Sequence, residues 1–427
     1  MADQQEPTDH DLFADGTPDP YQAYAAFREQ APVRRVIQPD GLPVYYISGY
    51  AEARAALNDD RLAHHLRHAA PAMAAAGMPL DPQRINFGGA HMLHADPPEH
   101  PRLRKLVSRA FTAARVEALR PAVQRLVDEL IDAMPQHGEA DLVTALADPL
   151  PVLVICELLG VPTADRTDFR RWSNATLGSD FATDLPMSRA EGKRLLREYM
   201  TDLVVAKRKD LDPADPDGAP DLISALIQLR LRDGDDALTE EELVATSFIL
   251  LIAGQESTVN FLSLAMLGIT TDPALQRGLR ERPESVRHLF EELLRYDGPV
   301  QRSVIRTALS DIQLGGVTIP AGHVVCVGLA AANRDECRFP EAAKVDPERT
   351  DNAHLGFGHG RHFCLGAPLA RLEGHVALTA LAQRFDVLEL AVAAADLRWR
   401  RSFQRGLESL PVRLSAADAF GGRRPTT

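Results

Sequence analysis

The chain has 427 residues, 45% of them hydrophobic, and a formal net charge of −13. That composition is typical of a globular protein, and the negative charge disfavours nucleic acid as a partner. The four cysteines are widely scattered, which argues against a disulfide scaffold and for a reducing compartment. The N-terminus has no apolar signal core, and no run approaches the roughly 20 apolar residues of a membrane span. We therefore expect a cytoplasmic protein that does not enter a membrane.

The first elements are short. After a flexible tail over residues 1–19 we expect a helix over 20–30 and another over 50–57, with a strand pair at 33–37 and 44–48 between them. Pro39-Asp-Gly between the two strands predicts a hairpin turn. Residues 61–89 show no periodicity, so the sequence leaves open whether they form a solvent loop or cover a ligand.

A proline-rich start, Asp96-Pro-Pro-Glu-His-Pro, opens a helix that carries His100 and Arg104. The two basic side chains are four residues apart, so they share one helix face. Such a pair is usually solvated.

Amphipathic helices are predicted over 116–134, 149–159 and 189–208. A break at 176–187 is a candidate flexible lid, and residues 210–217 read as an acidic surface loop. The longest helix is predicted over 239–270, where Thr239 and Glu242 form a capping box.

The middle of this long helix holds Gly254 and Glu256 within an apolar run. A glycine and a carboxylate are costly there, so they invite a functional explanation. The alternative is that Glu256 faces solvent on a partly buried helix.

Glu292 and Arg295 are one turn apart on a helix predicted over 283–296, as in a common ion pair. A strand is predicted over 299–306, and further strand patterns continue to residue 329.

A glycine-rich loop over residues 354–366 contains Cys364 and precedes a helix predicted over 367–385. The helix N-terminus and the neighbouring Arg361 and His362 favour the ionised sulfur. A thiolate is one of the few axial ligands by which proteins hold haem iron. Taken alone, such a cysteine is more often a buried free thiol beside a turn.

The spacing of this loop is specific. Phe357, Gly360, His362, Cys364 and Gly366 fill the pattern F-x-x-G-x-H-x-C-x-G, which closely resembles the haem-binding loop of the cytochrome P-450 family. The resemblance implies a mainly α (α+β) single-domain fold over residues 20–414, a helical bundle around a haem with small β-sheets. Residues 415–427 would form a C-terminal tail.

The resemblance also implies a ligand set for haem b. Cys364 would be the axial iron ligand, and His100, Arg104, Arg306 and His362 would bind the propionates. The expected cofactor contacts are completed by Leu93, Gly356, Phe357, Gly358, Arg361, Gly366 and Ala370. Glu292, Arg295 and Arg349 match the family's structural E-x-x-R pair and its third member.

The long helix resembles the family's oxygen-binding helix. Ala253 and Gly254 would give dioxygen room, and Glu256, Ser257 and Thr258 would relay protons. The chain departs from the family at Ser257, where threonine is usual. Expected substrate contacts are Gln255, Val300, Ser303, Val304 and Phe403.

The implied reaction is insertion of one atom of O2, by hydroxylation or epoxidation, into an apolar secondary metabolite such as a polyketide or macrolide. The chain lacks a flavin or iron–sulfur motif, so electrons from NAD(P)H would arrive through a ferredoxin reductase and a ferredoxin. Lys105, Arg361 and Arg371 are a candidate docking patch, and we expect a monomer. A peroxide-driven or radical-coupling oxidase, or a non-enzymatic haem sensor, remain as alternatives.

Overall fold

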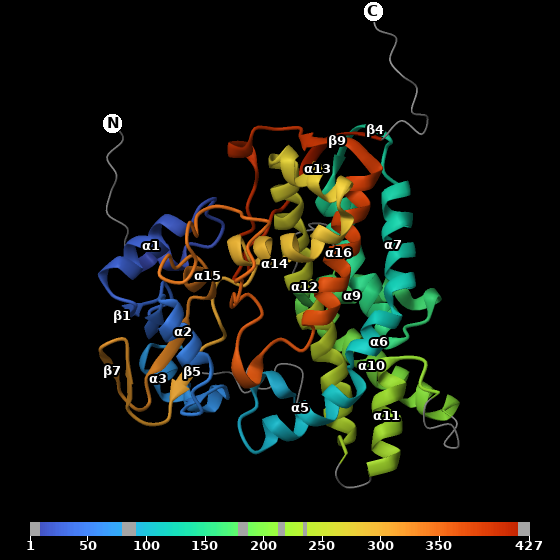
Figure 1. Cartoon of the computed structure of the whole chain (residues 1–427). Helices are drawn as coiled ribbons and strands as arrows, with labels where there is room; N and C mark the ends of the chain where they lie inside the picture. The colour runs from blue at the N-terminus through green and yellow to red at the C-terminus, as the bar shows by residue number, and fades with distance from the viewer. Residues whose placement is uncertain (1–8, 79–90, 178–186, 212–217, 234–236, 417–427) are drawn as a thin grey trace, which may run out of the picture.

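The computed structural model describes residues 9–78, 91–177, 187–211, 218–233 and 237–416. Its central element is α12, Glu240–Thr271, which runs through the middle of the molecule (Figure 1). The capping box predicted at its start is present, since Thr239 and Glu242 each accept from the other's backbone N–H. Helices α8 (Pro149–Leu159), α10 (Arg189–Asp210), α14 (Val286–Tyr296) and α16 (Ala367–Arg384) pack around α12.

The remaining helices cover this core or border the sheets. They are α1 (Tyr21–Gln30), α2 (Tyr50–Leu57), α3 (Ala70–Ala75), α5 (Glu99–Ala110), α6 (Ala113–Ala118), α7 (Arg120–Asp132), α9 (Arg166–Leu177), α11 (Leu222–Asp233), α13 (Pro273–Glu281) and α15 (Leu329–Asn333).

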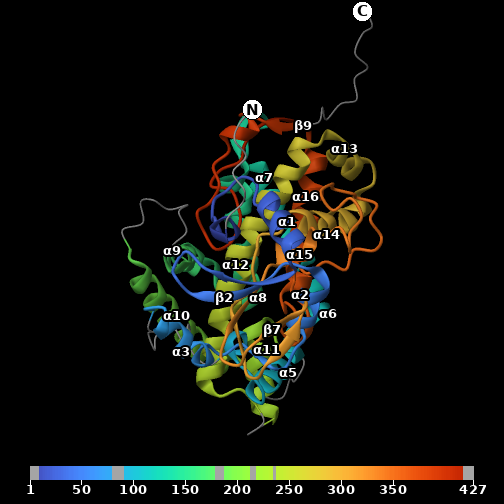
Figure 2. The ribbon, with the colours of Figure 1, turned by 90° about the vertical axis from the view of Figure 1, so that its left-hand side faces the viewer.

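The largest sheet has the strand order β1-β2-β8-β5-β3. It is built from β1 (Val33–Ile37), β2 (Pro43–Ile47), β3 (Leu62–Ala63), β5 (Arg306–Ala308) and β8 (Val324–Val327). Only β2 and β8 pair in parallel. A side view shows this sheet with α1, α2 and α15 in front of α12 (Figure 2).

Two smaller sheets complete the fold. One has the order β4-β10-β9, with β4 (His137–Asp141), β9 (Phe385–Leu390) and β10 (Pro411–Ala416), and the other pairs β6 (Ile312–Leu314) with β7 (Val317–Ile319). The mainly helical fold with small sheets agrees with the sequence-based expectation.

Helix α12 is long and apolar enough to cross a membrane, which the sequence reading overlooked. However, 72% of its most apolar window is buried inside the protein, as expected for a core helix. It therefore gives no support for a membrane span.

Several sequence-based boundaries were wrong. The first 19 residues are not all a tail, because Leu12 and Phe13 are buried in the core and a 3₁₀ helix spans Asp9–Phe13. The helix predicted over 116–134 is broken at Leu119 into α6 and α7. The strand predicted over 299–306 starts only at its last residue, where β5 begins, and the residues before it form just the isolated bridge between Val300 and Gln404.

Helices α9, α11 and α13 were not predicted, although each contributes buried apolar side chains to the core. The predicted lid over 176–187 and the acidic loop over 210–217 lie largely outside the described residues.

Candidate functional site

A large cavity lies between α12 and the loop that precedes α16. The space it outlines, including the part that is open to solvent, is about 1620 Å³, and it is lined mainly by apolar side chains. Cys364 opens into it from one side, and Ala253, Gly254, Ser257 and Thr258 border it from α12. The structure thus brings the two most distinctive stretches of the sequence together around one space.

The loop that carries Cys364 is held by its own backbone. The Cys364 N–H donates to the Phe357 carbonyl at 2.9 Å, which folds the loop back on itself. Gly358 and Gly360 both have φ of +73°, a conformation that L-residues rarely adopt. A Cβ at Gly360 would also lie 2.8 Å from the Leu57 carbonyl oxygen, so both geometry and space require glycine there.

The Cys364 thiol is in a mixed electrostatic environment. Burial raises its pKa, while the backbone N–H groups of Gly366 and Ala367 and the positive charges of Arg104 and Arg371 lower it. The expected effect of the helix N-terminus is present. Arg361, one of the two basic residues expected to favour the ionised sulfur, is paired with Asp60, and the arginines that lower the pKa of Cys364 most are Arg104 and Arg371.

Basic side chains gather at one end of the cavity. The ring of His362 lies 4.0 Å from the ring of His100 and 3.5 Å from the ring of His64, measured between centroids. Arg104 and Arg306 line the same end, and Arg306 is anchored by a 2.8 Å hydrogen bond from Nη1 to the Ala56 carbonyl.

Four buried nitrogens of this cluster have no hydrogen-bond partner among the described residues. They are Nδ1 of His64, Nε2 of His100, Nε of Arg306 and Nε2 of His362. Burial also lowers the pKa of Arg306 to about 10 and lowers the pKa of His100. Buried polar groups normally form hydrogen bonds. Four buried nitrogens without a hydrogen-bond partner, in a cluster that includes two arginines, therefore fit an anionic ligand that binds at this end of the cavity. The two propionate carboxylates of haem are such a ligand.

His64 was missed by the sequence reading. It lies in the stretch without periodicity, where nothing in the pattern distinguishes it from a loop histidine. Its position is fixed by the Asp96 carboxylate, which accepts the backbone N–H of His64 at 2.7 Å and that of His65 at 3.0 Å. The side chain is 4% exposed and lines the cavity.

The α12 wall of the cavity carries a hydrogen bond from a side chain to the helix backbone. Ser257 Oγ donates to the Ala253 carbonyl at 2.9 Å, a bond to the preceding turn that Ser and Thr both make in helices. A Cβ at Gly254 would lie 2.9 Å from Ile155 Cδ1, so Gly254 also lets α8 approach. The lack of a side chain at Gly254 therefore allows α8 to pack closely and also leaves room in the cavity.

Two expected substrate contacts lie elsewhere. Gln255 is buried against α9, where Nε2 donates to Asn174 Oδ1 at 2.7 Å and Oε1 accepts from Ser173. Phe403 is 44% exposed and stacks near Arg302. Neither lines the cavity, because the helical turn points Gln255 away and the turn that holds Phe403 faces outward.

Arg361, an expected cofactor contact, does not line the cavity and is paired with Asp60 instead, whereas nine other expected contacts do line it. They are Leu93, Val300, Ser303, Val304, Gly356, Phe357, Gly358, Gly366 and Ala370. Phe357 lies beneath the guanidinium of Arg371, with Cζ 4.6 Å from the ring centroid. Glu256 is not part of this lining, and its carboxylate instead meets Ser402 at 3.3 Å.

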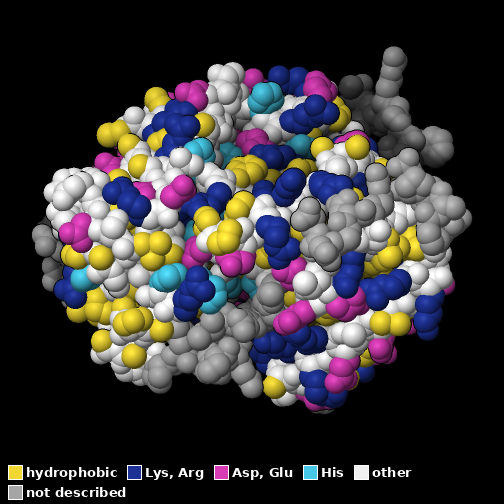
Figure 3. Space-filling model, turned by 90° about the horizontal axis from the view of Figure 1, so that it is seen from below, with side chains coloured by type: hydrophobic (Ala, Val, Ile, Leu, Met, Phe, Trp, Pro, Cys, Tyr) yellow, Lys and Arg dark blue, Asp and Glu magenta, His cyan; other side chains and the backbone are white. Residues whose placement is uncertain are grey.

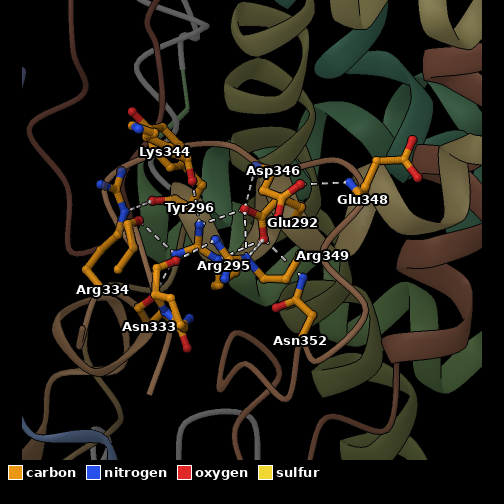
Figure 4. A network of polar contacts seen from close by, with 12 residues as sticks. Glu292, Arg295, Tyr296, Asn333, Arg334, Lys344, Asp346, Glu348, Arg349 and Asn352 are labelled. Carbon is orange, nitrogen blue, oxygen red and sulfur yellow. Dashed lines mark hydrogen bonds and ion pairs between the residues drawn. The ribbon is translucent and has the colours of Figure 1, made fainter. Parts of the chain in front are cut away.

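The predicted Glu292–Arg295 pair is fully buried (Figure 4). Arg295 donates to both carboxylate oxygens at 2.8 and 2.7 Å, and Arg349 Nε reaches them at 3.2 and 3.3 Å. The remaining Arg295 donors meet the carbonyls of Asn333, Ala342 and Lys344. The structure therefore brings the three expected residues together and uses them to hold the chain that leads into the Cys364 loop.

The comparisons with known proteins agree with this arrangement. The family model "Cytochrome P450" matches residues 186–393. The chain is 43% identical over 96% of its length to "Vitamin D(3) 25-hydroxylase" of Pseudonocardia autotrophica, covering 98% of that protein. It is 41% identical over 92% of its length to "6-deoxyerythronolide B hydroxylase" of Saccharopolyspora erythraea, covering 96% of it.

A solved structure, the ligand-free P450 monooxygenase TamI, superimposes with a TM-score of 0.82 at 40% identity, covering 94% of this chain and 92% of TamI. The chain belongs to the cytochrome P450 family. It is a haem-dependent P450 monooxygenase that uses O2, and its haem iron takes a cysteine thiolate ligand. The cavity with its thiol on one side and its basic cluster at one end fits that cofactor. Haem supplies the dioxygen chemistry when bound, and the protein supplies the ligand, the orientation and the protons.

Proposed function

We propose that this P450 oxidises an apolar polyketide or macrolide-like metabolite, with Cys364 as the axial ligand. The observation that carries the proposal is the mainly apolar lining of the cavity, which has Cys364 on one wall and the basic cluster at one end. Concave pockets with a mainly apolar lining bury most of the surface of a small-molecule ligand, and the part of this cavity that haem does not fill would take the metabolite. The names of the relatives, which include a hydroxylase of 6-deoxyerythronolide B, support the same substrate class.

The residues that line the cavity fall into three groups, which would bind the haem, contact the metabolite and transfer protons. His64, His100, Arg104, Arg306 and His362 would hold the propionates by charge-assisted hydrogen bonds. Val300, Ser303 and Val304 would contact the metabolite, and Ser257 and Thr258 would place hydroxyl groups where protons are needed.

The test of the substrate class is a titration of the haem-loaded protein with 6-deoxyerythronolide B, vitamin D3 and myristic acid, followed by the low- to high-spin shift of the Soret band. Binding of the macrolide precursor and its conversion to a product 16 mass units heavier support the proposal. A response to myristic acid alone would contradict it. Turnover with hydrogen peroxide in place of the electron donors would favour the peroxide-driven alternative.

We further propose that a ferredoxin and its reductase deliver the electrons, and that the protein acts as a cytoplasmic monomer. The expected docking patch is less basic than its sequence indicates. Arg371 is bonded to Glu291 at 2.6 and 2.8 Å, and Arg361 is paired with Asp60. Lys105 is exposed, and on the face seen in Figure 3 basic and acidic side chains are interspersed.

Charge reversal at Lys105, Arg361 and Arg371 tests this interaction. If ferredoxin docks there, the rate of haem reduction by a surrogate ferredoxin falls and its salt dependence weakens, while reduction by dithionite is unchanged. Unchanged rates with ferredoxin would remove the patch from consideration.

A further inference from the structure

Glu256 points away from the haem cavity and toward the turn formed by residues 399–407. Its Oε1 accepts a 3.3 Å hydrogen bond from Ser402 Oγ. The next residue, Ser257, lines the cavity. Glu256, the acid expected to relay protons, is therefore oriented toward the turn that contains Ser402.

That turn is fastened along α12. Its two arms are joined by the Arg400 N–H to Gly406 carbonyl bond of 3.0 Å and by a bridge between Trp399 and Leu407. The Leu407 N–H donates to Ser263 Oγ at 3.3 Å, and a Cβ at Gly406 would lie 2.2 Å from Asn260 Oδ1. Glu256 and Asn260 are four residues apart, so the same face of α12 carries both to the turn.

A small polar space lies beside the turn. It is bordered by Asp15 and Thr17 of the N-terminal segment and by Arg302, Arg400 and Ser402. It leaves about 20 Å³ for the centre of a water molecule, which exceeds the roughly 10–15 Å³ that one water needs. Ser402 thus borders this space and bonds Glu256 at once.

Buried polar atoms without hydrogen-bond partners lie where α12 contacts the turn. Nδ2 and Oδ1 of Asn260, which is 0% exposed, and Oε1 of Gln404 make no hydrogen bond to the described part of the chain. Buried amides in native proteins are almost always paired, and ordered water is the usual partner where protein groups do not reach. The region between α12 and the turn is therefore suited to hold water.

Burial and the polar groups around Glu256 act on its pKa in opposite directions. Burial raises its pKa, while Ser402, Arg400 and Arg189 lower it in part. Arg302 and Arg405 on the turn side are already paired, with Asp15 at 3.0 Å and Asp297 at 2.7 Å. Arg400, 5% exposed, is the positive charge of the turn that acts on Glu256.

We propose that this polar space is the solvent-side branch of the proton relay, with Ser402 and Arg400 as residues that position Glu256. Each oxygen insertion consumes two electrons and two protons and releases one water. In this scheme Glu256 loses a proton toward the cavity and regains one from water through the Ser402 hydroxyl, so the carboxyl returns to its starting state. The proposal rests on the monooxygenase activity and on the relay role of Glu256.

The test measures NADPH-driven oxygen consumption by the haem-loaded full chain with a surrogate ferredoxin and reductase, in H2O and in D2O. We expect Ser402→Ala to slow oxygen consumption by about fivefold or more and to increase the solvent isotope effect. Ser402→Thr, which keeps the hydroxyl, should restore both values. Arg401→Ala, an exposed neighbour in the same turn, is the matched control and should leave them unchanged.

Two further readouts make the outcome decisive. The rate of haem reduction should be the same in all variants, and a crystal structure should show ordered water within hydrogen-bonding distance of Asn260 or Ser402. Wild-type rates and isotope effects in Ser402→Ala, or a dry interface, would overturn the proposal. Failure of the monooxygenase function is distinguishable, because the wild-type protein would then consume oxygen without forming a product 16 mass units heavier than the added metabolite.

Discussion

At the residue scale, the basic end of the cavity is more extensive than the sequence predicted. Four basic residues were expected there from the family resemblance, and the structure adds His64 through a 3.5 Å ring contact with His362. Its neighbour His65 caps the next turn by accepting the Arg67 N–H at 3.1 Å and does not line the cavity. The two adjacent histidines are therefore a natural test and control.

We predict that His64→Ala increases the rate of haem transfer to apomyoglobin by about tenfold. The substitution removes one hydrogen bond to a propionate carboxylate, which contributes about 1.5 kcal/mol to haem binding. His65→Ala should not change that rate. Equal effects of the two substitutions would indicate a general loosening of the loop and would remove His64 from the ligand set.

Ser257 is the residue where the chain departs from its family. The hydroxyl that matters is already held by the Ala253 carbonyl at 2.9 Å, so the missing methyl group of threonine leaves the hydrogen bond in place. We predict that Ser257→Thr preserves the yield of product per NADPH and that Ser257→Ala lowers it by about tenfold or more, with the difference recovered as peroxide. Equal yields for all three proteins would show that this hydroxyl takes no part in the relay.

At the element scale, the Glu292 network joins α14 to the chain that leads into the Cys364 loop. Glu292 forms ion pairs with the fully buried Arg295 and the largely buried Arg349, and it also accepts the Asp346 N–H at 2.8 Å. We predict that Glu292→Gln destabilises the protein by about 3–5 kcal/mol, because it leaves two buried cations poorly compensated. Urea unfolding measures this change.

The matched control is Glu198→Gln, which breaks an exposed pair with Arg194 on α10. It should change the free energy of unfolding by no more than about 0.5 kcal/mol. Similar losses for the two variants would contradict the structural role of the buried network.

A second element-scale contact links α14 to α16 and predicts a pH dependence. Burial raises the pKa of Glu291, but the hydrogen bonds from Arg371 and His354 outweigh it and lower that pKa to about 2. A carboxyl with a depressed pKa in the folded state stabilises the protein above its unfolded pKa near 4.5, and that contribution is lost as pH falls toward 2.

We therefore expect Glu291→Gln to lower stability at pH 7 and to flatten the decline in stability between about pH 4.5 and pH 2, as measured by urea unfolding at a series of pH values. A parallel decline in variant and wild-type protein would show that Glu291 is not linked to acid unfolding.

At the scale of the whole molecule, the sequence predicted the elements with local determinants. Helix α12 begins at its capping box, α2 and α8 have the predicted bounds, and the β1–β2 hairpin follows its turn. The missed helices α9, α11 and α13 and the break at Leu119 depend on which faces other helices cover, and that information is tertiary.

The candidate site divides in the same way. Cys364, His100, Arg104, Arg306 and His362 could be assigned from motif spacing, and the structure places them around one cavity. His64 could not, because only folding brings residues 64 and 362 together. Gln255 and Phe403 were misplaced since adjacent positions on a helix or turn face different regions, which spacing alone does not reveal.

The central claim is that Cys364 provides the thiolate that binds the haem iron. The most direct measurement is the difference spectrum of the dithionite-reduced protein with and without carbon monoxide, for the wild type and for Cys364→Ala. Our account predicts a strongly red-shifted Soret band in the wild type that is absent in the variant, with Cys337→Ala, an exposed cysteine outside the cavity, behaving as wild type. A wild-type band without that shift, or one that survives the loss of Cys364, would contradict it.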